Sequence, residues 1–240
     1  MEKKEGFKLR ESVNHQFKFA NMTIPGREET LSIVARLATL FISDEPRFLD
    51  VGCGWGDVTK KILELCPHAS VCMVDYSEEM FILAKEILGD DNRIKMISYD
   101  LNNGLPDMLK SGKFDAVVSC HALHHVEHEN KVELYTQIKQ VLNESGLFIN
   151  GDRFKAESPL ISNWEFDNWI EWMVDEVRNT LGKEKAFDGV KKAQIEWDEK
   201  LGDKPGTIWD TQRDLKQAGF QYADCVWKSY NMAIVVATDK

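Results

Sequence analysis

Three glycines separated by single residues, Gly52, Gly54 and Gly56, stand where a short apolar segment gives way to an amphipathic one. Glycine lets the backbone take positive φ angles and approach a ligand closely. The N-terminus of the helix expected behind this turn would point backbone N–H groups at a carboxylate or another anion. The GxGxG spacing differs from the GxGxxG of dinucleotide-binding turns. We therefore expect a ligand-binding turn, and the spacing disfavours an NAD(P)-dependent dehydrogenase.

Chemically useful side chains also follow the next two predicted strands. Asp75 ends the second strand, where a carboxylate can accept hydrogen bonds from both hydroxyls of a ribose. Its alternative role is to begin the helix that follows Tyr76. Met80, within that helix, could pack on a purine face. Asp100 and Leu101, at the end of the third strand, suit an adenine edge, which offers one donor and one acceptor.

A histidine-rich segment follows the fourth predicted strand. Four histidines fall within eight residues: His121, His124, His125 and His128. Their i, i+4 pairs would chelate a metal only on a helix, and a strand end at Ser119 places them on a turn instead. No HExxH motif is present, so we assign no metal site. His121, His125 and Asp152, all just beyond strand ends, are the candidates for a general base.

Elements of alternating type must position these residues. Short apolar segments alternate with amphipathic ones, which is typical of a parallel sheet with crossover helices. The predicted strands are Arg47–Val51, Val71–Asp75, Ile94–Ser98, Phe114–Ser119 and Leu147–Gly151. The predicted helices are Glu28–Ile42, Asp57–Leu65, Glu78–Leu88, the short Asn103–Leu109 and Glu129–Leu142. The carboxyl ends of the strands should bring the glycine turn, the acids and the histidines to one crevice.

The C-terminal segment departs from this alternation. A helix is expected over Ile208–Ala218, followed by strands Tyr222–Lys228 and Met232–Ala237 joined by a turn at Tyr230-Asn231. A hairpin at the end of a parallel sheet makes the last strand antiparallel to the others. The predicted fold is therefore α/β: a seven-stranded, mostly parallel Rossmann-like sheet with an antiparallel last strand and helices on both faces.

Residues 154–205 interrupt the pattern between the fifth and sixth strands and are predicted to form a helical cap. Five of the seven tryptophans lie in this insertion or at its exit: Trp164, Trp169, Trp172, Trp197 and Trp209. A regular apolar stripe should face the core: Ile170, Met173, Val174, Val177 and Leu181. Trp169 and Trp172 fall outside this stripe, which indicates a second buried surface, either a substrate pocket or a homodimer contact.

The predicted organisation has three parts. Residues 1–27 form an arm or lid, residues 28–153 and 206–240 form the ligand-binding domain, and residues 154–205 form the cap. The chain of 240 residues has a formal net charge of −10. An acidic surface repels phosphate backbones and anionic membranes, so neither nucleic acid nor a membrane is an expected partner.

Composition also bears on location. No apolar segment reaches the roughly 18 residues that span a bilayer, and the charged N-terminus leads into no secretory signal. The five cysteines are odd in number and form no CxxC pair. We therefore expect a cytoplasmic protein with reduced thiols.

Taken together, the strand ends resemble the class I S-adenosylmethionine (SAM) dependent methyltransferases. The matching segments are Asp50–Gly56, Asp75, Asp100-Leu101, Phe114–Ser119 and Ala122–Val126. The resemblance implies SAM as cofactor and S-adenosylhomocysteine (SAH) as product. It implies these cofactor-binding residues: Asp50, Gly52, Cys53, Gly54, Asp75, Tyr76, Met80, Asp100, Leu101 and Cys120. Among them, Asp50, Gly52 and Gly54 would hold the methionine part, and Cys120 or His121 would lie near the sulfonium.

Two further segments refine the resemblance. Glu144–Asp152 and Leu215–Phe220 resemble small-molecule methyltransferases of the ubiquinone/menaquinone type, and Phe19–Gly26 is similar to the N-terminal segment of carboxy-SAM synthases. The expected function is in-line methyl transfer to a small-molecule acceptor, in which positioning supplies most of the rate. The alternatives are a SAM enzyme with other chemistry, of the carboxy-SAM synthase kind, and a SAM-binding regulator or scaffold without catalysis.

The charge of the acceptor stays open. Glu165 and Glu176 beside the cap tryptophans would suit a cationic or aromatic acceptor, whereas Arg153 and Lys155 would suit an anionic one.

Overall fold

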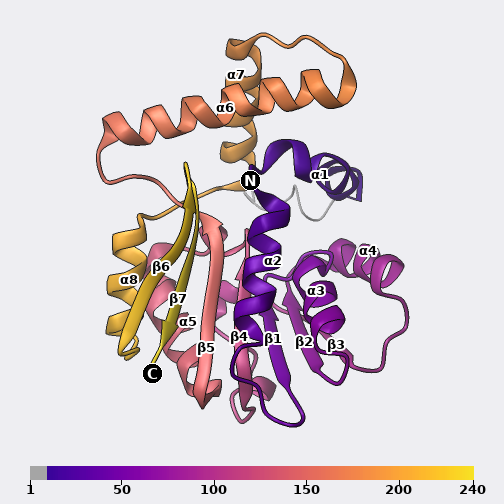
Figure 1. Cartoon of the computed structure of the whole chain (residues 1–240), viewed down its shortest axis with the longest axis vertical. Helices are drawn as coiled ribbons and strands as arrows, with labels where there is room; N and C mark the ends of the chain where they lie inside the picture. The colour runs from indigo at the N-terminus through magenta and orange to yellow at the C-terminus, as the bar shows by residue number, and fades with distance from the viewer. Residues whose placement is uncertain (1–9) are drawn as a thin grey trace.

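The computed structural model describes residues 10–240, and its centre is one seven-stranded sheet of order β3-β2-β1-β4-β5-β7-β6 (Figure 1). The strands are β1 (Arg47–Val51), β2 (Ser70–Asp75), β3 (Ile94–Ser98), β4 (Phe114–Cys120), β5 (Leu142–Arg153), β6 (Tyr222–Ser229) and β7 (Met232–Thr238). Strand β7 is antiparallel to both of its neighbours, whereas the pairs among β1 to β5 are parallel. This confirms the predicted fold, including the antiparallel last strand.

Helices cover both faces of the sheet. One face carries α2 (Arg27–Ala38), α3 (Asp57–Leu65) and α4 (Glu78–Leu88), and the other carries α5 (His128–Val141) and α8 (Ile208–Gln217). Successive side chains of a strand point to opposite faces. Phe48 of β1 therefore packs in the cluster with α2 and α3, whereas Leu49 and Val51 pack in the cluster with α5 and α8. Burial on both faces explains why the strands are almost continuously apolar.

The strand order reverses between β1 and β4. Strands β2 and β3 lie on one side of β1, and β4 and β5 lie on the other. At such a point the connections leave the sheet in opposite directions and open a crevice outside the carboxyl ends of the strands. The glycine turn follows β1 and the histidine segment follows β4, so the topology brings both to this crevice.

The cap consists of α6 (Pro159–Leu181) and α7 (Phe187–Leu201), which lie beyond the carboxyl ends of the parallel strands (Figure 1). Helix α1 (Arg10–Thr23) lies beside them. The indole Nε1 of Trp169 in α6 donates a hydrogen bond of 2.8 Å to the backbone oxygen of Thr23. The cap is thus joined to the N-terminal helix as well as to the sheet. No helix within residues 10–240 combines the length and apolar character that crossing a membrane requires.

The predicted helix Asn103–Leu109 is wrong. Two short 3-10 turns, Leu101–Asn103 and Asp107–Leu109, take its place. Gly104 between them has a φ of 81°, and Pro106 has no N–H to donate to a helical turn. The two residues therefore divide the segment.

Helix α2 is shorter than predicted, because it ends at Ala38 and not at Ile42. The chain after it is held as a loop: the backbone N–H and the hydroxyl of Ser43 both donate to the carboxylate of Asp115. The last apolar residue of the predicted helix, Ile42, was taken as its end, but Ile42 is exposed and lies outside the helix.

The predicted placement of Trp169 outside the apolar stripe of the cap is also wrong. Trp169, Ile170 and Met173 are buried in one cluster together with Met232 of β7. Trp169 and Met173 are one helical turn apart and share a face. Leu181, by contrast, is exposed because it is the last residue of α6. The buried face of α6 is therefore wider than the predicted stripe and ends earlier.

Candidate functional site

A cavity of about 760 Å³ lies between the carboxyl ends of the strands, α1 and the cap. All ten predicted cofactor-binding residues line it: Asp50, Gly52, Cys53, Gly54, Asp75, Tyr76, Met80, Asp100, Leu101 and Cys120. Two of the three predicted catalytic residues, His121 and His125, line it as well. The third, Asp152, is buried behind the cavity wall. The cavity thus brings together residues from β1, β2, β4 and the segment after β3.

The glycine turn needs glycine for different reasons at different positions. Gly52, Gly54 and Gly56 have φ angles of 69°, 52° and 85°. A Cβ on Gly52 would lie 2.3 Å from the Cβ of Ala122, so packing excludes a side chain there. A Cβ on Gly54 would approach only the sulfur of Met80, at 3.9 Å. The space in front of Gly54 is therefore open cavity, where a ligand can approach the backbone.

Asp75 connects the glycine turn to the end of β2. Its Oδ2 accepts a hydrogen bond of 2.9 Å from the Gly54 N–H, and its Oδ1 accepts one of 2.9 Å from the Ser77 N–H. The N-cap of α4 is Ser77, whose hydroxyl accepts from the Met80 N–H at 3.2 Å. Carboxylate oxygens can each accept more than one hydrogen bond. Asp75 therefore orders the turn while it lines the cavity.

Asp50 is the buried acid at the base of the turn. The hydroxyl of Thr59 donates to its Oδ2 at 2.7 Å. Within residues 10–240 its Oδ1 is buried and has no hydrogen-bond partner. Burial, offset only in part by the Thr59 hydrogen bond, raises the pKa of Asp50 to about 7. A cationic group of a ligand would satisfy this oxygen and stabilise the charged carboxylate.

Asp100 and Leu101, the residues predicted to bind adenine, lie on the segment after β3. Asp100 Oδ1 accepts from the backbone N–H of Asn102 at 3.0 Å and from its side-chain amide at 2.9 Å. This turn buries Leu101 against the main core cluster and places it on the cavity wall.

Arg27, a residue of the cavity wall, was not among the predicted site residues. Arg27 forms an ion pair with Asp57, and the indole of Trp55 donates to the same carboxylate. The guanidinium of Arg27 also lies 5.4 Å from the centre of the Trp55 ring. Arg27 begins α2 and Asp57 begins α3, so no motif within one segment could have shown that they meet.

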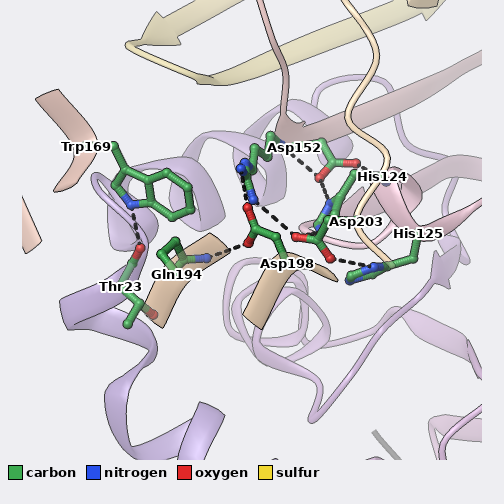
Figure 2. Close-up of polar contacts among 9 residues, drawn as sticks. Thr23, His124, His125, Asp152, Trp169, Gln194, Asp198 and Asp203 are labelled. Carbon is green, nitrogen blue, oxygen red and sulfur yellow. Dashed lines mark hydrogen bonds and ion pairs between the residues drawn. The ribbon is translucent and has the colours of Figure 1, made fainter. Parts of the chain in front are cut away.

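At the other end of the cavity, Asp152 holds His124 (Figure 2). His124 Nδ1 lies 2.6 Å from Asp152 Oδ1, and the His124 backbone N–H donates to Asp152 Oδ2 at 3.0 Å. His124 was noted in the histidine segment but was not among the predicted site residues. Asp152 was predicted just beyond the fifth strand, but β5 runs to Arg153, so Asp152 lies inside the strand. Its contact with His124 depends on the path of the turn after β4, which the sequence did not predict.

Asp203, at the exit of the cap, reaches both histidines. Its Oδ1 lies 3.1 Å from His125 Nδ1, and its Oδ2 lies 3.7 Å from His124 Nε2. Arg153 connects the two sides of this region, since its guanidinium contacts Asp203 at 3.1 Å and Asp198 at 2.7 Å. The same guanidinium lies 4.5 Å from the Trp169 ring centre. Asp198 and Asp203 were not predicted, because no local pattern relates them to the histidines.

The three imidazoles near Asp152 differ in their affinity for protons. Burial lowers the pKa of His121 to about 4. Burial, together with the neighbouring His124, also lowers the pKa of His125. Burial opposes protonation of His124 too, but Asp152 and Asp203 outweigh it and raise its pKa. His121 and His125 are therefore the neutral imidazoles at pH 7, and His124 is the one that favours a proton.

The Asp152 carboxylate stays charged. Burial would raise its pKa, but the His124 imidazole and its hydrogen bond outweigh burial and lower the pKa to about 2. Asp152 can therefore orient His124 across the physiological pH range, as carboxylates commonly do for imidazoles.

The fold and the cavity define a class of protein: a Rossmann-like α/β protein with a glycine-turn cavity at the switch point of its sheet, closed by a helical cap. A family model described as "Methyltransferase domain" matches residues 48–146, from β1 into β5. The match confirms, over this part of the chain, the resemblance to class I SAM-dependent methyltransferases that the strand-end motifs predicted.

Individual relatives are distant. A carboxy-S-adenosyl-L-methionine synthase of Glaesserella parasuis is 22% identical over 98% of this chain and 95% of its own length. A demethylmenaquinone methyltransferase of Leptospira interrogans is 27% identical over 53% of this chain and 47% of its own.

Among solved structures, human N-acetylserotonin methyltransferase in complex with SAM shares the fold. The TM-score is 0.58 at 16% identity, over 97% of this chain. This chain spans 57% of the length of that chain.

Proposed function

We propose that this protein transfers the methyl group of SAM to a small-molecule acceptor bound beneath the cap. The observation that carries the proposal is a single cavity with two chemically different ends. The glycine turn and the acids Asp50 and Asp75 line one end, and the aromatic side chains of the cap line the other. Two ligands that must meet for in-line transfer fit such an arrangement.

The residues of the cofactor end match the parts of SAM. The buried Oδ1 of Asp50 suits the ammonium of the methionine part, because it has no protein partner within residues 10–240. Asp75, at the tip of β2, suits the ribose hydroxyls. Asp100 and Leu101 suit the adenine. When bound, SAM supplies a methyl group on a positively charged sulfur.

The acceptor end favours an apolar or aromatic molecule. Its walls include Phe19 of α1, Trp169 and Met173 of α6, and Trp197 of α7. Burying such a molecule against aromatic side chains supplies most of the binding energy. The histidines and Asp203 are the polar groups that would orient its reactive atom.

Methyl transfer breaks the bond between sulfur and the methyl carbon and forms one between that carbon and the acceptor, while the bonding electron pair stays on sulfur. An acidic acceptor also releases a proton. The neutral imidazoles of His121 and His125, both on the cavity wall, are suited to accept it. Asp152 lies behind His124 and acts as a positioning residue in this proposal.

The test is release of SAH from SAM with matched panels of aromatic and aliphatic phenols, alcohols, thiols, amines and carboxylates. We expect turnover with apolar acceptors that carry an ionisable group, and none in the Gly54→Val variant. SAM binding without SAH release for any acceptor would contradict the proposal and favour the non-catalytic alternative.

A second candidate is a SAM enzyme of the carboxy-SAM synthase kind. The observation that favours it is the similarity to such a synthase over nearly the full length of both chains. Mass spectrometry of the ligand that accompanies the purified protein separates the two, because a carboxylated SAM differs in mass from SAM and SAH. The homodimer, the three-part domain division and the cytoplasmic location stay predictions.

A further inference from the structure

His124, His125 and Asp203 form a compact set of donor atoms on the cavity wall (Figure 2). One ligand atom from each residue lies within 4.8 Å of the other two. The His125 Nδ1 to Asp203 Oδ1 distance is 3.1 Å, and His124 Nε2 lies 3.7 Å from Asp203 Oδ2. Ligands about 2.1 Å from a tetrahedral zinc ion are about 3.4 Å apart. The two observed distances, each measured to a different oxygen of Asp203, lie on either side of that value.

Asp152 completes the arrangement from behind. It lies 2.6 Å from Nδ1 of His124 and accepts the backbone N–H of the same residue. A carboxylate that accepts the Nδ1–H of a histidine fixes the ring and leaves Nε2 with its lone pair available for a metal. Asp152 therefore occupies the position of the outer carboxylate in a carboxylate–histidine–metal unit, with His124 as the histidine.

The excess of carboxylates in the cluster also favours a bound cation. The groups in direct contact are three carboxylates, from Asp152, Asp198 and Asp203, and one guanidinium, from Arg153. The carboxylates outnumber the guanidinium by two in this largely buried region, where a proton on His124 or a bound cation can offset them. Buried charge of one sign needs a counterion or a bound proton. A divalent cation would balance it.

We propose that His124, His125 and Asp203 bind one divalent first-row transition-metal ion of the zinc type. Two imidazoles and one carboxylate form a donor set that such ions prefer, and Ca²⁺ and Mg²⁺, which favour oxygen ligands, do not. From the sequence no metal site was assigned, because the histidines were placed on a turn, where their i, i+4 pairs could not chelate an ion. The third ligand comes from the exit of the cap, far along the chain.

Two properties follow from the position of the site. The three ligands line the cavity, so a remaining coordination position faces the space where an acceptor would lie. The histidines follow β4 and Asp203 follows α7, so the ion would also join the cap to the sheet. The first property rests on the proposed function, and with the ion bound to His125 the proton of an acidic acceptor would go to His121. The second property does not depend on methyl transfer.

The experiment is Zn²⁺ binding to the full chain after removal of metals with a chelator, measured by equilibrium dialysis and elemental analysis. We expect about one Zn²⁺ per chain, a rise in the melting temperature on adding Zn²⁺, and a visible Co²⁺ spectrum of a nitrogen- and oxygen-ligated ion. Asp203→Asn and His125→Gln should each weaken Zn²⁺ binding by at least about 100-fold. Asp152→Asn should weaken it about 10- to 100-fold, as outer carboxylates do.

His128→Gln is the matched control, since His128 belongs to the same histidine segment but not to the ligand set. It should bind Zn²⁺ like the wild type. SAM affinity, measured on every variant, reports whether the fold is intact. Failure of the wild type to retain Zn²⁺, equal Zn²⁺ affinity in Asp203→Asn, or an equal loss in His128→Gln would each overturn the proposal.

Discussion

The two ends of the cavity are built by different means. At the glycine end, one short turn presents its backbone to the cavity beside the side chains of Asp50 and Asp75. The N–H groups of Gly52 and Cys53 hold this turn by donating to the Val74 oxygen at 2.8 and 3.2 Å. At the cap end, the surface is made of side chains from helices α1, α6 and α7 and from the loop after β4. A backbone surface has few ways to change, whereas a side-chain surface changes with each substitution. The difference suits one invariant ligand and one variable ligand.

The largest effect is expected at the glycine end. Gly54→Val places a branched side chain in the open cavity in front of the turn, and we expect SAM affinity to fall by at least about 100-fold in calorimetry. Gly89→Val is the matched control. Gly89 also has a positive φ, of 72°, but nothing lies within 4 Å of its Cβ position. Both variants place a side chain at a positive φ, which costs about 1–3 kcal/mol. Equal SAM affinity in the two variants would therefore contradict the proposed difference between the two ends of the cavity.

A change in pH should act on the same end with a smaller effect. The pKa of about 7 for Asp50 means that the group is partly protonated at neutral pH. Pairing with the ligand ammonium needs the carboxylate, so protons compete with SAM. SAM affinity therefore falls as the pH drops through 7, by about tenfold between pH 7.5 and pH 6.

Titration calorimetry at several pH values checks this expectation. Asp50→Asn should bind weakly and without this pH dependence. If the SAM affinity of Asp50→Asn still fell at low pH, the group that titrates would be a residue other than Asp50.

The smallest effect is expected at the cap end. Trp197→Ala removes one of several aromatic side chains that line the cap end of the cavity. We expect the KM for the acceptor to rise about fivefold, because one truncated contact is worth about 1 kcal/mol. SAM affinity should be unchanged. Trp209→Ala is the control, since Trp209 is largely exposed and does not line the cavity. A fall in SAM affinity in Trp197→Ala would show that the two ends are not separate.

The same contrast explains what the sequence could predict. The Gly52–Gly56 turn and Asp75 were found because strand ends and glycine spacing are local patterns that the parallel topology converts into one crevice. Asp203 was missed because its contact with His125 depends on how the cap returns to the sheet. Trp169 was misplaced for a related reason: periodicity gives the position on a helix, but the partners decide which face is buried.

The fold itself was predicted closely for the same physical reason. Strands buried on both faces, such as β1 and β4, have short apolar segments that stand out from the amphipathic helices between them. The helix predicted between β3 and β4 does not form, because Gly104 and Pro106 favour short turns over a helix.

The chain enters and leaves the cap at one place. The Lys155 N–H donates to the Gly206 oxygen at 2.9 Å, and the two segments form a single bridge between Lys155 and Thr207. Because these ends already touch, the cost of closing the chain there grows only slowly with the length of what lies between them. The cap can therefore lengthen, shorten or be exchanged for another segment while β5 and α8 keep their register. Replacing this one continuous segment, the cap, would change the acceptor end of the cavity and leave the sheet unchanged.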